Sequence, residues 1–289
     1  MARKEIFFIG SSSSGLQSLS ENDFFSIEGV FCLENRTTPE IKRLSDDLNI
    51  PFYQFKWISE FRTVINQICK DKTTFFIYQL DMLVPEDLVK KHEFFNLHRG
   101  SLKTNRGPSP DIWPILLGEK NTCMSLHQIN EKIDAGLLID EYWVEIQRED
   151  TVNSIKIKLE KGLPELVQSL VLFIKGEKKS FEITDGLYRP WITEKDFTID
   201  IDKDDFETIA RKIHSQSEYN GAVLFYNNNK YYVNAIMDVE HTHMKPTNIE
   251  IDLIKNHVKL RIKDKTLICK LNMEPKFTPP PKFPKAIRI

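Results

Sequence analysis

The first hundred residues alternate between strand and helix patterns, and this alternation constrains the fold more than any other feature. Lys4–Gly10 and Phe25–Leu33 are typical of strands, whereas Thr38–Leu48 is typical of a helix with a threonine cap and a proline at its first position. Thr73–Tyr78 is a compact apolar run, as expected for a parallel strand covered on both faces. The alternation predicts a doubly wound α/β sheet that binds ligands at the carboxyl ends of its strands.

A different pattern follows in the last third of the chain. Residues 151–175 form one long helical pattern, and residues 185–196 are typical of a linker. An amphipathic helix with apolar residues at Phe206, Ile209, Ala210 and Ile213 then precedes hairpins that begin at Ala222. The first turn is expected at Asn227-Asn228-Asn229, and strands are expected near 230–238, 247–253, 256–261 and 265–271.

The two patterns predict two domains. Residues 1–190 are expected to form an α/β domain with a doubly wound, Rossmann-like sheet, and residues 197–289 a small, mainly antiparallel β domain. The tail from Pro275 to Ile289 is rich in proline and lysine and is expected to be extended. His241 and His243 form a His-x-His pattern that we interpret as a polar hairpin end, because no carboxylate or cysteine pattern accompanies it.

Composition excludes several classes of protein. The chain has 289 residues, of which 40% are hydrophobic, so it can bury a sizeable core. The four cysteines are scattered, which argues against a zinc site or a disulfide framework and for a reducing cytoplasm. No apolar run is long enough to span a bilayer, and the first apolar stretch is too short for a signal peptide. The formal net charge of −2 gives no electrostatic case for binding nucleic acid over the whole surface.

Three polar residues could form an acyl-transfer site. Asn96 and His98 lie two positions apart in an expected strand, so their side chains point to the same face. An amide donor can hydrogen-bond a developing oxyanion, and an imidazole can move a proton. Asp134 can orient and charge that imidazole if the fold returns it to the same edge. The pair alone would also fit a satisfied edge of a core.

The surrounding sequence resembles the catalytic core of the folate-dependent formyltransferases. The resemblance rests on Asn-Leu-His at 96–98, Asn-Arg-Gly-Pro at 105–108, Thr-Cys-Met-Ser-Leu-His at 122–127 and Ile-Asp-Ala-Gly at 133–136, in this order. It implies catalytic roles for Asn96, His98 and Asp134, and 10-formyltetrahydrofolate as the co-substrate, with no metal. It also implies that folate binds along one segment before the catalytic strand and near the Asp-x-Gly pattern; those residues are Leu80, Asp81, Met82, Leu83, Val84 and Gly136.

Several positions depart from the family pattern. Arg99 stands where the family usually has proline, and Leu102-Lys103 stands where it has Leu-Pro, so the loop after the catalytic strand is expected to be more mobile. Cys123 and Asp81 stand where glycine is common. A carboxylate at 81 is expected to contact the pterin or to change the shape of its pocket. The three catalytic positions are unchanged, which favours an active enzyme.

The acceptor amine is open among several classes. The Asn-Arg-Gly-x-x-Pro-x-x-Trp pattern is similar to sugar N-formyltransferases, which formylate a nucleotide-linked amino sugar. We expect that acceptor to be held by a glycine–serine turn, an arginine and a tryptophan, at Gly10, Ser11, Ser12, Arg106 and Trp113. A methionyl-tRNA formyltransferase would need a basic surface, yet residues 196–289 carry 15 Lys/Arg against 13 Asp/Glu.

Another small amine is a further possible acceptor, and a folate- or nucleotide-binding module without activity is the non-enzyme alternative. Similarity to the glycinamide ribonucleotide formyltransferases ranks last, because they lack the Arg-Gly turn and the C-terminal extension. Residues 197–289 resemble the C-terminal barrel-like β domain of methionyl-tRNA formyltransferases. We expect them to be accessory, either covering apolar surface or building an oligomer interface such as that of a homodimer, because no catalytic pattern falls in them.

Overall fold

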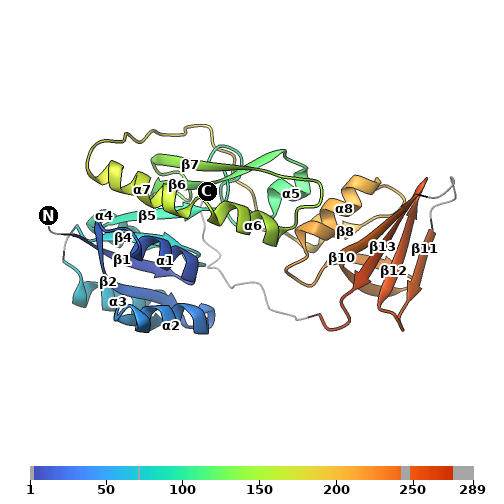
Figure 1. Cartoon of the computed structure of the whole chain (residues 1–289), viewed down its shortest axis with the longest axis horizontal. Helices are drawn as coiled ribbons and strands as arrows, with labels where there is room; N and C mark the ends of the chain where they lie inside the picture. Colours follow the sequence, from blue (N-terminus) through green and yellow to red (C-terminus); the bar gives the residue numbers. More distant parts are fainter. Residues whose placement is uncertain (1–2, 71, 242–247, 276–289) are drawn as a thin grey trace.

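The computed structural model describes residues 3–70, 72–241 and 248–275, which fold around two sheets (Figure 1). The expected His243 and most of the expected proline-rich tail lie outside these residues. Each sheet has its own hydrophobic core, and the two sheets follow one another along the chain. The division into domains at residues 190 and 197 remains a prediction. No helix within the described ranges is long and apolar enough to cross a membrane.

The first sheet has seven strands in the order β3-β2-β1-β4-β5-β6-β7. Strands β1 to β5 are parallel, and β6 and β7 are antiparallel additions at one edge. The order reverses between β1 and β4, which is the point where doubly wound sheets form their ligand crevice. The strands are β1 (Lys4–Gly10), β2 (Phe25–Leu33), β3 (Phe52–Phe55), β4 (Thr74–Tyr78), β5 (Glu93–His98), β6 (Asn121–Gln128) and β7 (Leu138–Glu145).

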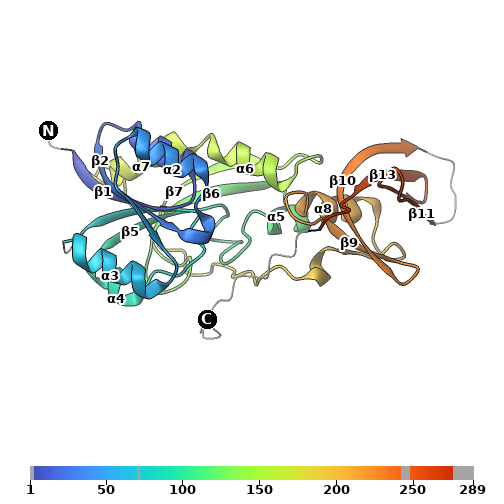
Figure 2. The ribbon, with the colours of Figure 1, turned by 90° about the horizontal axis from the view of Figure 1, so that it is seen from below.

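Helices cover both faces of this sheet (Figures 1 and 2). One face packs against α1 (Ser13–Ser20), α2 (Pro39–Asp47), α6 (Val152–Glu160) and α7 (Leu163–Ile174). The other face packs against α3 (Ile58–Ile68) and α4 (Glu86–Lys91). The short α5 (Trp113–Leu117) lies between β5 and β6 in the chain, and η1 (Glu34–Arg36) follows β2. This arrangement confirms the predicted doubly wound α/β sheet.

The predicted single helix over residues 151–175 is wrong, because the chain forms two helices there. α6 ends at Glu160, and α7 begins at Leu163 with Pro164 in its first turn. Proline has no backbone N–H and its ring clashes with the carbonyl four residues earlier, so one continuous helix through Glu160 is excluded. Gly162 lies at the junction, where a Cβ atom would overlap the ring of Tyr142.

The second sheet is curled and mainly antiparallel, as predicted (Figure 1). The predicted asparagine turn joins its first hairpin, with positive φ at Asn227 and Asn228. Strand β8 is the exception, since it runs parallel to β9. The order is β11-β12-β13-β10-β9-β8, with bounds β8 (Thr198–Ile199), β9 (Ala222–Tyr226), β10 (Asn229–His241), β11 (Asn248–Asp252), β12 (His257–Ile262) and β13 (Lys265–Leu271).

The short η2 (Glu194–Phe197) precedes β8. Helix α8 (Phe206–Ser215) follows β8 and packs between the second sheet and the first part of the chain. The buried α8 residues Ile209 and Ile213 belong to the second core, as the amphipathic pattern predicts. The same helix packs against α5, and Arg148 donates from Nε to Glu207 at 3.1 Å. The two parts of the chain are therefore joined by packing and charge as well as by the linker.

The start of α8 gives a test of the fold. Asp205 caps the helix, and its Oδ1 accepts a hydrogen bond from the Thr208 amide at 2.8 Å. Replacing Asp205 with Ala removes this acceptor and should lower the free energy of unfolding by roughly 1 kcal/mol in urea titrations. Asp205→Asn is the matched control, because asparagine caps helices about as well. Equal losses in the two variants would contradict the assigned cap.

Candidate active site

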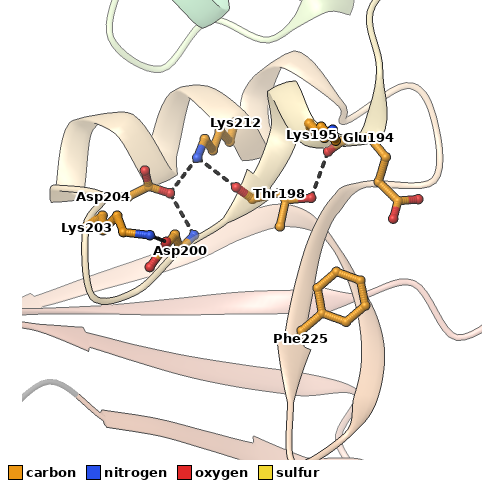
Figure 3. A pocket seen from close by; sticks show the side chains of 8 residues that line it. All are labelled: Glu194, Lys195, Thr198, Asp200, Lys203, Asp204, Lys212 and Phe225. Carbon is orange, nitrogen blue, oxygen red and sulfur yellow. Dashed lines mark hydrogen bonds and ion pairs between the residues drawn. The ribbon is translucent and has the colours of Figure 1, made fainter.

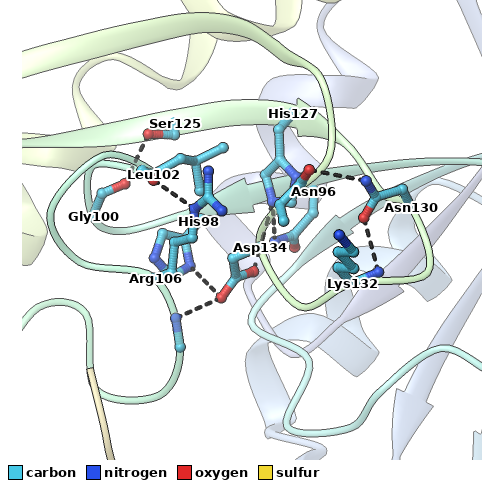
Figure 4. Close-up of polar contacts among 12 residues, drawn as sticks. Asn96, His98, Gly100, Leu102, Arg106, Ser125, His127, Asn130, Lys132 and Asp134 are labelled. Carbon is cyan, nitrogen blue, oxygen red and sulfur yellow. Dashed lines mark hydrogen bonds and ion pairs between the residues drawn. The ribbon is translucent and has the colours of Figure 1, made fainter. Parts of the chain in front are cut away.

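Asn96 and His98 lie on the same side of β5, beside the antiparallel strand β6 (Figure 4). Phe94, two residues before Asn96, packs into the core under α3 and α4, so this side of the strand faces that core. The alternation inferred from the sequence is therefore present, and both side chains reach the carboxyl end of the strand. The loop between β6 and β7 returns Asp134 to the same place, so the structure brings all three candidate catalytic residues together.

Asn96 lies opposite His127 in the strand register and makes a side-chain hydrogen bond to it. The Asn96 Nδ2 atom is 3.1 Å from His127 Nε2. An amide nitrogen can only donate, so His127 Nε2 is the acceptor and its ring carries the proton on Nδ1. The bond uses one of the two N–H groups of the Asn96 amide. The second N–H group is left to donate to another acceptor.

His98 is oriented by a main-chain carbonyl on one side and by a carboxylate on the other. Its Nε2 atom donates to the carbonyl oxygen of Asn105 at 2.7 Å, because a carbonyl oxygen can only accept. Its Nδ1 atom faces Asp134, with 3.6 Å to Oδ2. The His98 side chain is only 6% exposed. This arrangement presents Nδ1 as the ring atom that can hold a proton beside a negative charge.

Asp134 is aimed at the imidazole by its loop. The residue has a φ of 47°, in the left-handed region, and its Oδ2 accepts a hydrogen bond from the Gly107 amide at 2.8 Å. Two residues later, a Cβ atom at Gly136 would overlap the carbonyl oxygen of Gln128. Only glycine permits this close approach of two backbones. The Asp-x-Gly pattern thus supplies a carboxylate together with the residue that lets its loop close.

His127 adjoins Asn96, but it is not among the candidate site residues expected from the sequence. It is buried, and burial lowers its pKa from the usual 6.5 to about 4, although Asp134 acts in the opposite direction. His127 is therefore neutral at pH 7 and acts as a hydrogen-bond acceptor toward Asn96. The signal was present in the sequence, since an antiparallel return strand ending in Ser-Leu-His places a histidine beside Asn-Leu-His, but the strand register was unknown.

Comparison with known proteins finds similar sequences and solved structures. No protein-family model matches the chain. The chain is 30% identical over 150 residues to the bifunctional polymyxin resistance protein ArnA of Wigglesworthia glossinidia brevipalpis, covering 50% of the chain and 23% of that protein. It is 26% identical over 248 residues to methionyl-tRNA formyltransferase of Malacoplasma penetrans, covering 78% of the chain and 75% of that protein. The chain thus spans about a quarter of its ArnA relative.

Solved structures share the fold over nearly the whole chain. WlaRD, a sugar 3N-formyltransferase studied with dTDP and 5-N-formyl-THF, matches with a TM-score of 0.66 and 19% identity over 95% of this chain and 100% of its own. HypX from Aquifex aeolicus in complex with tetrahydrofolic acid matches with a TM-score of 0.67 and 17% identity over 93% of this chain and 44% of its own. The chain has the formyltransferase fold. The resemblance inferred from the sequence to folate-dependent formyltransferases is confirmed.

In this formyltransferase fold, the expected folate segment is the loop between β4 and α4. Leu80, Met82 and Val84 are partly buried and pack against the core under α3 and α4. Leu83 is 44% exposed and is the residue of the segment that offers apolar surface. Asp81 forms an ion pair with Arg36, at the end of η1. The roles of these residues and of Gly136 toward folate remain predictions.

The expected acceptor turn lies where the sheet order reverses, at the ends of β1 and β4. Gly10 has a φ of 138°, and a Cβ atom there would overlap the carbonyl oxygen of Tyr78. Ser11 donates from its backbone amide to the carbonyl of Gln79 at 3.3 Å. Ser12 caps α1, where its hydroxyl accepts from the Gly15 amide at 3.0 Å. Whether this turn binds an acceptor remains a prediction.

Arg106 and Trp113 hold the segment that was expected to be a linker. The Arg106 guanidinium donates to the carbonyls of Leu102 at 2.6 Å and Ile183 at 2.5 Å, and its side chain is 8% exposed. The Trp113 indole donates to the carbonyl of Pro190 at 3.0 Å. Both side chains therefore anchor the chain around residues 183–190 in this arrangement. Their contact with an acceptor remains a prediction.

The loop after β5 has Arg99 and Lys103 where folate-dependent formyltransferases usually have proline, but hydrogen bonds anchor it. The Ser125 hydroxyl donates to the carbonyl of Gly100 at 2.7 Å, and the Asn105 amide donates to the carbonyl of Ser101 at 2.8 Å. These bonds fix the carbonyl that orients His98. The loop thus reaches a defined conformation without the missing prolines; its expected mobility remains a prediction.

A shallow hollow of about 540 Å³ lies away from these residues, between the start of the second sheet and α8 (Figure 3). Four of its charged groups, Asp200, Lys203, Asp204 and Lys212, are paired within the protein. Lys212 donates to Asp204 at 2.6 Å and to the carbonyl of Thr198 at 2.7 Å, and Lys203 pairs with Asp200 at 2.7 Å. The hollow therefore presents few free donors, and the strand-end site remains the better candidate for chemistry.

The low pKa of His127 predicts an acid-dependent loss of stability. The unfolded chain takes up this proton near pH 6.5, whereas the folded chain resists it down to about pH 4. The wild type should therefore lose stability relative to His127→Gln, whose side chain cannot titrate, as the pH falls from 6.5 to 4. The change in this difference should approach roughly 3 kcal/mol in urea titrations. A pH-independent difference would contradict the buried, neutral histidine.

Proposed function

We propose that this protein transfers a formyl group from 10-formyltetrahydrofolate to a primary amine. The observation that carries the proposal is the convergence of Asn96, His98 and Asp134 at one strand end of a formyltransferase fold. An amide with a free N–H group, an imidazole and a carboxylate suit acyl transfer to an amine. Tetrahydrofolate in HypX, which has the same fold, supports a folate co-substrate.

Residues of the β4–α4 loop would hold the folate, with Leu83 offering apolar surface to its flat ring and backbone groups available for its edge. Bound at this edge, 10-formyltetrahydrofolate supplies the electrophilic formyl carbon. The formyl oxygen needs a hydrogen-bond donor during the reaction, and Asn96 can supply it because one N–H group remains after its bond to His127. Among the described residues, no cluster of three or more His, Cys, Asp or Glu side chains could hold a metal ion.

Asn96 is assigned to the developing negative charge. As the neutral amine attacks the formyl carbon, the formyl oxygen gains charge, and the free N–H of Asn96 donates to it. His127 fixes the amide orientation before the reaction, so this donor does not need to reorganise. The neutral state of His127 matters here, because a protonated ring would no longer accept the bond from Asn96.

His98 and Asp134 are assigned to proton transfer. The attacking amine must lose one proton as its new bond to carbon forms, and the departing folate nitrogen must gain one. Asp134 lies beside His98 Nδ1, so it can accept the proton of the amine and pass it to Nδ1, from which the proton reaches the departing folate nitrogen. The Asn105 carbonyl keeps the ring in the orientation that allows this exchange.

Single substitutions test these roles. Asn96→Ala should lower kcat by about 10²- to 10³-fold, because it removes an oxyanion donor. His98→Ala and Asp134→Asn should each lower kcat by about 10²- to 10⁴-fold through loss of proton transfer. Asn121→Ala and Asp87→Asn, at exposed positions on the same sheet and on α4, are the matched controls and should keep full activity. A folded site variant with wild-type turnover would remove that residue from the mechanism.

We propose a nucleotide-linked amino sugar as the acceptor. WlaRD and the N-formyltransferase of Helicobacter canadensis, studied with dTDP and with dTDP-3-aminofucose respectively, support this class. The similarity to methionyl-tRNA formyltransferase makes Met-tRNA the second candidate. The charge of residues 196–289 is close to balanced, with 15 Lys/Arg against 13 Asp/Glu, which disfavours a polyanion such as tRNA.

An acceptor screen decides between these classes. Purified protein is incubated with 10-formyltetrahydrofolate and, separately, with dTDP- and UDP-linked amino sugars, free amino sugars and Met-tRNA, and product masses are recorded. We expect one added formyl group on a nucleotide-linked amino sugar, and none when the folate is omitted. Formylation of Met-tRNA alone would overturn the sugar assignment. Formylation of none of these amines, in a protein that also fails to bind a folate analogue, would overturn the proposed activity.

A further inference from the structure

Arg99 directly follows the catalytic strand and lies on the sheet face opposite to His98. Its guanidinium carbon is 6.0 Å from the ring centroid of Tyr78, the last residue of β4. The Tyr78 hydroxyl in turn donates to Glu160 Oε1, at the end of α6, at 3.3 Å. The guanidinium therefore lies on the face covered by α1, α6 and α7, while the expected folate segment packs on the face covered by α3 and α4.

This position adjoins the reversal point of the sheet. Gly10 at the end of β1 pairs in register with Tyr78 at the end of β4, and the ring of Tyr78 lies against Gly15 of α1. Arg99 is thus beside the glycine–serine turn, on the ligand-binding edge of a doubly wound sheet. Arg106, the arginine expected from the sequence to serve the acceptor, donates instead to two main-chain carbonyls. Arg99 is the better placed cation.

Arg99 is preorganised by a buried carboxylate. Its Nη2 atom is 2.9 Å from Oδ2 of Asp111, whose side chain is only 5% exposed. The Arg99 side chain is 22% exposed, so part of the guanidinium reaches the surface. A guanidinium has five N–H donors in a planar fork, of which Asp111 accepts from Nη2 and the Tyr78 side chain takes a further hydrogen bond. The remaining donors are fixed in direction, as a bidentate contact to phosphate requires.

The C-terminal part of the chain adds an aromatic residue to the same place. Tyr219 follows α8, which packs against α5, and Asp111 precedes α5 by two residues. Tyr219 interacts electrostatically with Asp111 and Arg99. Its ring is 53% exposed, and partial burial together with the charge of Asp111 raises its pKa to about 12. The hydroxyl therefore stays protonated at pH 7 and can donate to an anion.

We propose that Arg99 and Tyr219 bind the diphosphate of the acceptor, with Asp111 as the residue that positions Arg99. The inference rests on the proposed function and identifies the residues that would distinguish a nucleotide-linked amino sugar from a free one. It differs from the expectation that residues 197–289 are only accessory, because Tyr219 would complete the acceptor site. Arg99, a departure from the family pattern, becomes a specificity-determining residue of this chain.

Kinetics with the full chain test the inference. Arg99→Met should raise the KM for the nucleotide-linked amino sugar roughly 10- to 100-fold, through loss of charge-assisted hydrogen bonds, with little change in the KM for folate. Arg62→Met is the matched control, because Arg62 is also paired with an aspartate, Asp87, but lies on α3. Tyr219→Leu should raise the acceptor KM by a smaller factor, and Phe225→Leu, at an exposed ring on β9, should not.

A binding measurement separates this inference from the proposed activity. Uridine diphosphate and thymidine diphosphate are titrated by calorimetry into wild type and Arg99→Met. We expect saturable binding of at least one to wild type, weakened in Arg99→Met by a factor similar to the rise in KM. A wild-type acceptor KM in Arg99→Met, or no binding of either diphosphate to wild type, would overturn the inference while leaving formyl transfer intact. Arg99-dependent binding without formyl transfer would overturn the activity alone.

Discussion

The antiparallel pairing of β6 with β5 is the interaction on which the candidate site depends. Its register places His127 opposite Asn96 and Ser125 opposite His98. His127 then accepts from the amide of Asn96, and Ser125 holds the loop whose carbonyl orients His98. A slip of β6 by one residue would turn His127 and Ser125 to the other face of the sheet, away from Asn96 and His98. The parallel strand β5 carries the candidate catalytic residues at its carboxyl end, and the antiparallel strand β6 carries the residues that hydrogen-bond to them or to their loop.

The connection after β6 completes the site through a close backbone contact. Gly136 lies against the carbonyl of Gln128, and the loop between them turns back so that Asp134 faces the imidazole. Gly107, from the Arg-Gly turn, donates to the same carboxylate. The segment around Tyr188 covers that turn, because a Cβ atom at Gly107 would meet the Tyr188 ring. The two glycine-containing patterns are therefore positions where neighbouring chain segments touch.

Local signals in the sequence predicted most of the fold. The Thr38 cap with Pro39, the asparagine turn at 227–228 and the apolar run of β4 act within a few residues, so they could be identified without the tertiary structure. The break between α6 and α7 was missed although Pro164, in the first turn of α7, was the local signal. The long-range features, namely the parallel β8 and the packing of α8 against α5, had no local signal at all.

The site was predictable only in part for the same reason. Strand alternation alone placed Asn96 and His98 together, whereas Asp134 was assigned through the family resemblance, because a loop brings it back. Two further contacts depend on loop conformations that no periodicity reveals. They are the bond from His98 to the Asn105 carbonyl and the bond from the Arg106 guanidinium to the Leu102 carbonyl. Arg99 is a better placed cation than Arg106 because its side chain is more exposed, which residue type alone does not reveal.

Strand pairing prepares Asn96 as a donor, because it places the buried, neutral ring of His127 opposite the Asn96 amide as an acceptor. Nitrogen-15 NMR of the histidine rings, recorded from pH 8 to 5, tests this most directly, with His127→Gln to assign the signals. We expect the His127 ring to stay neutral over this range and to carry its proton on Nδ1, while His98 carries a proton on Nε2. A His127 ring that titrates near pH 6.5, or that is protonated on Nε2, would contradict it.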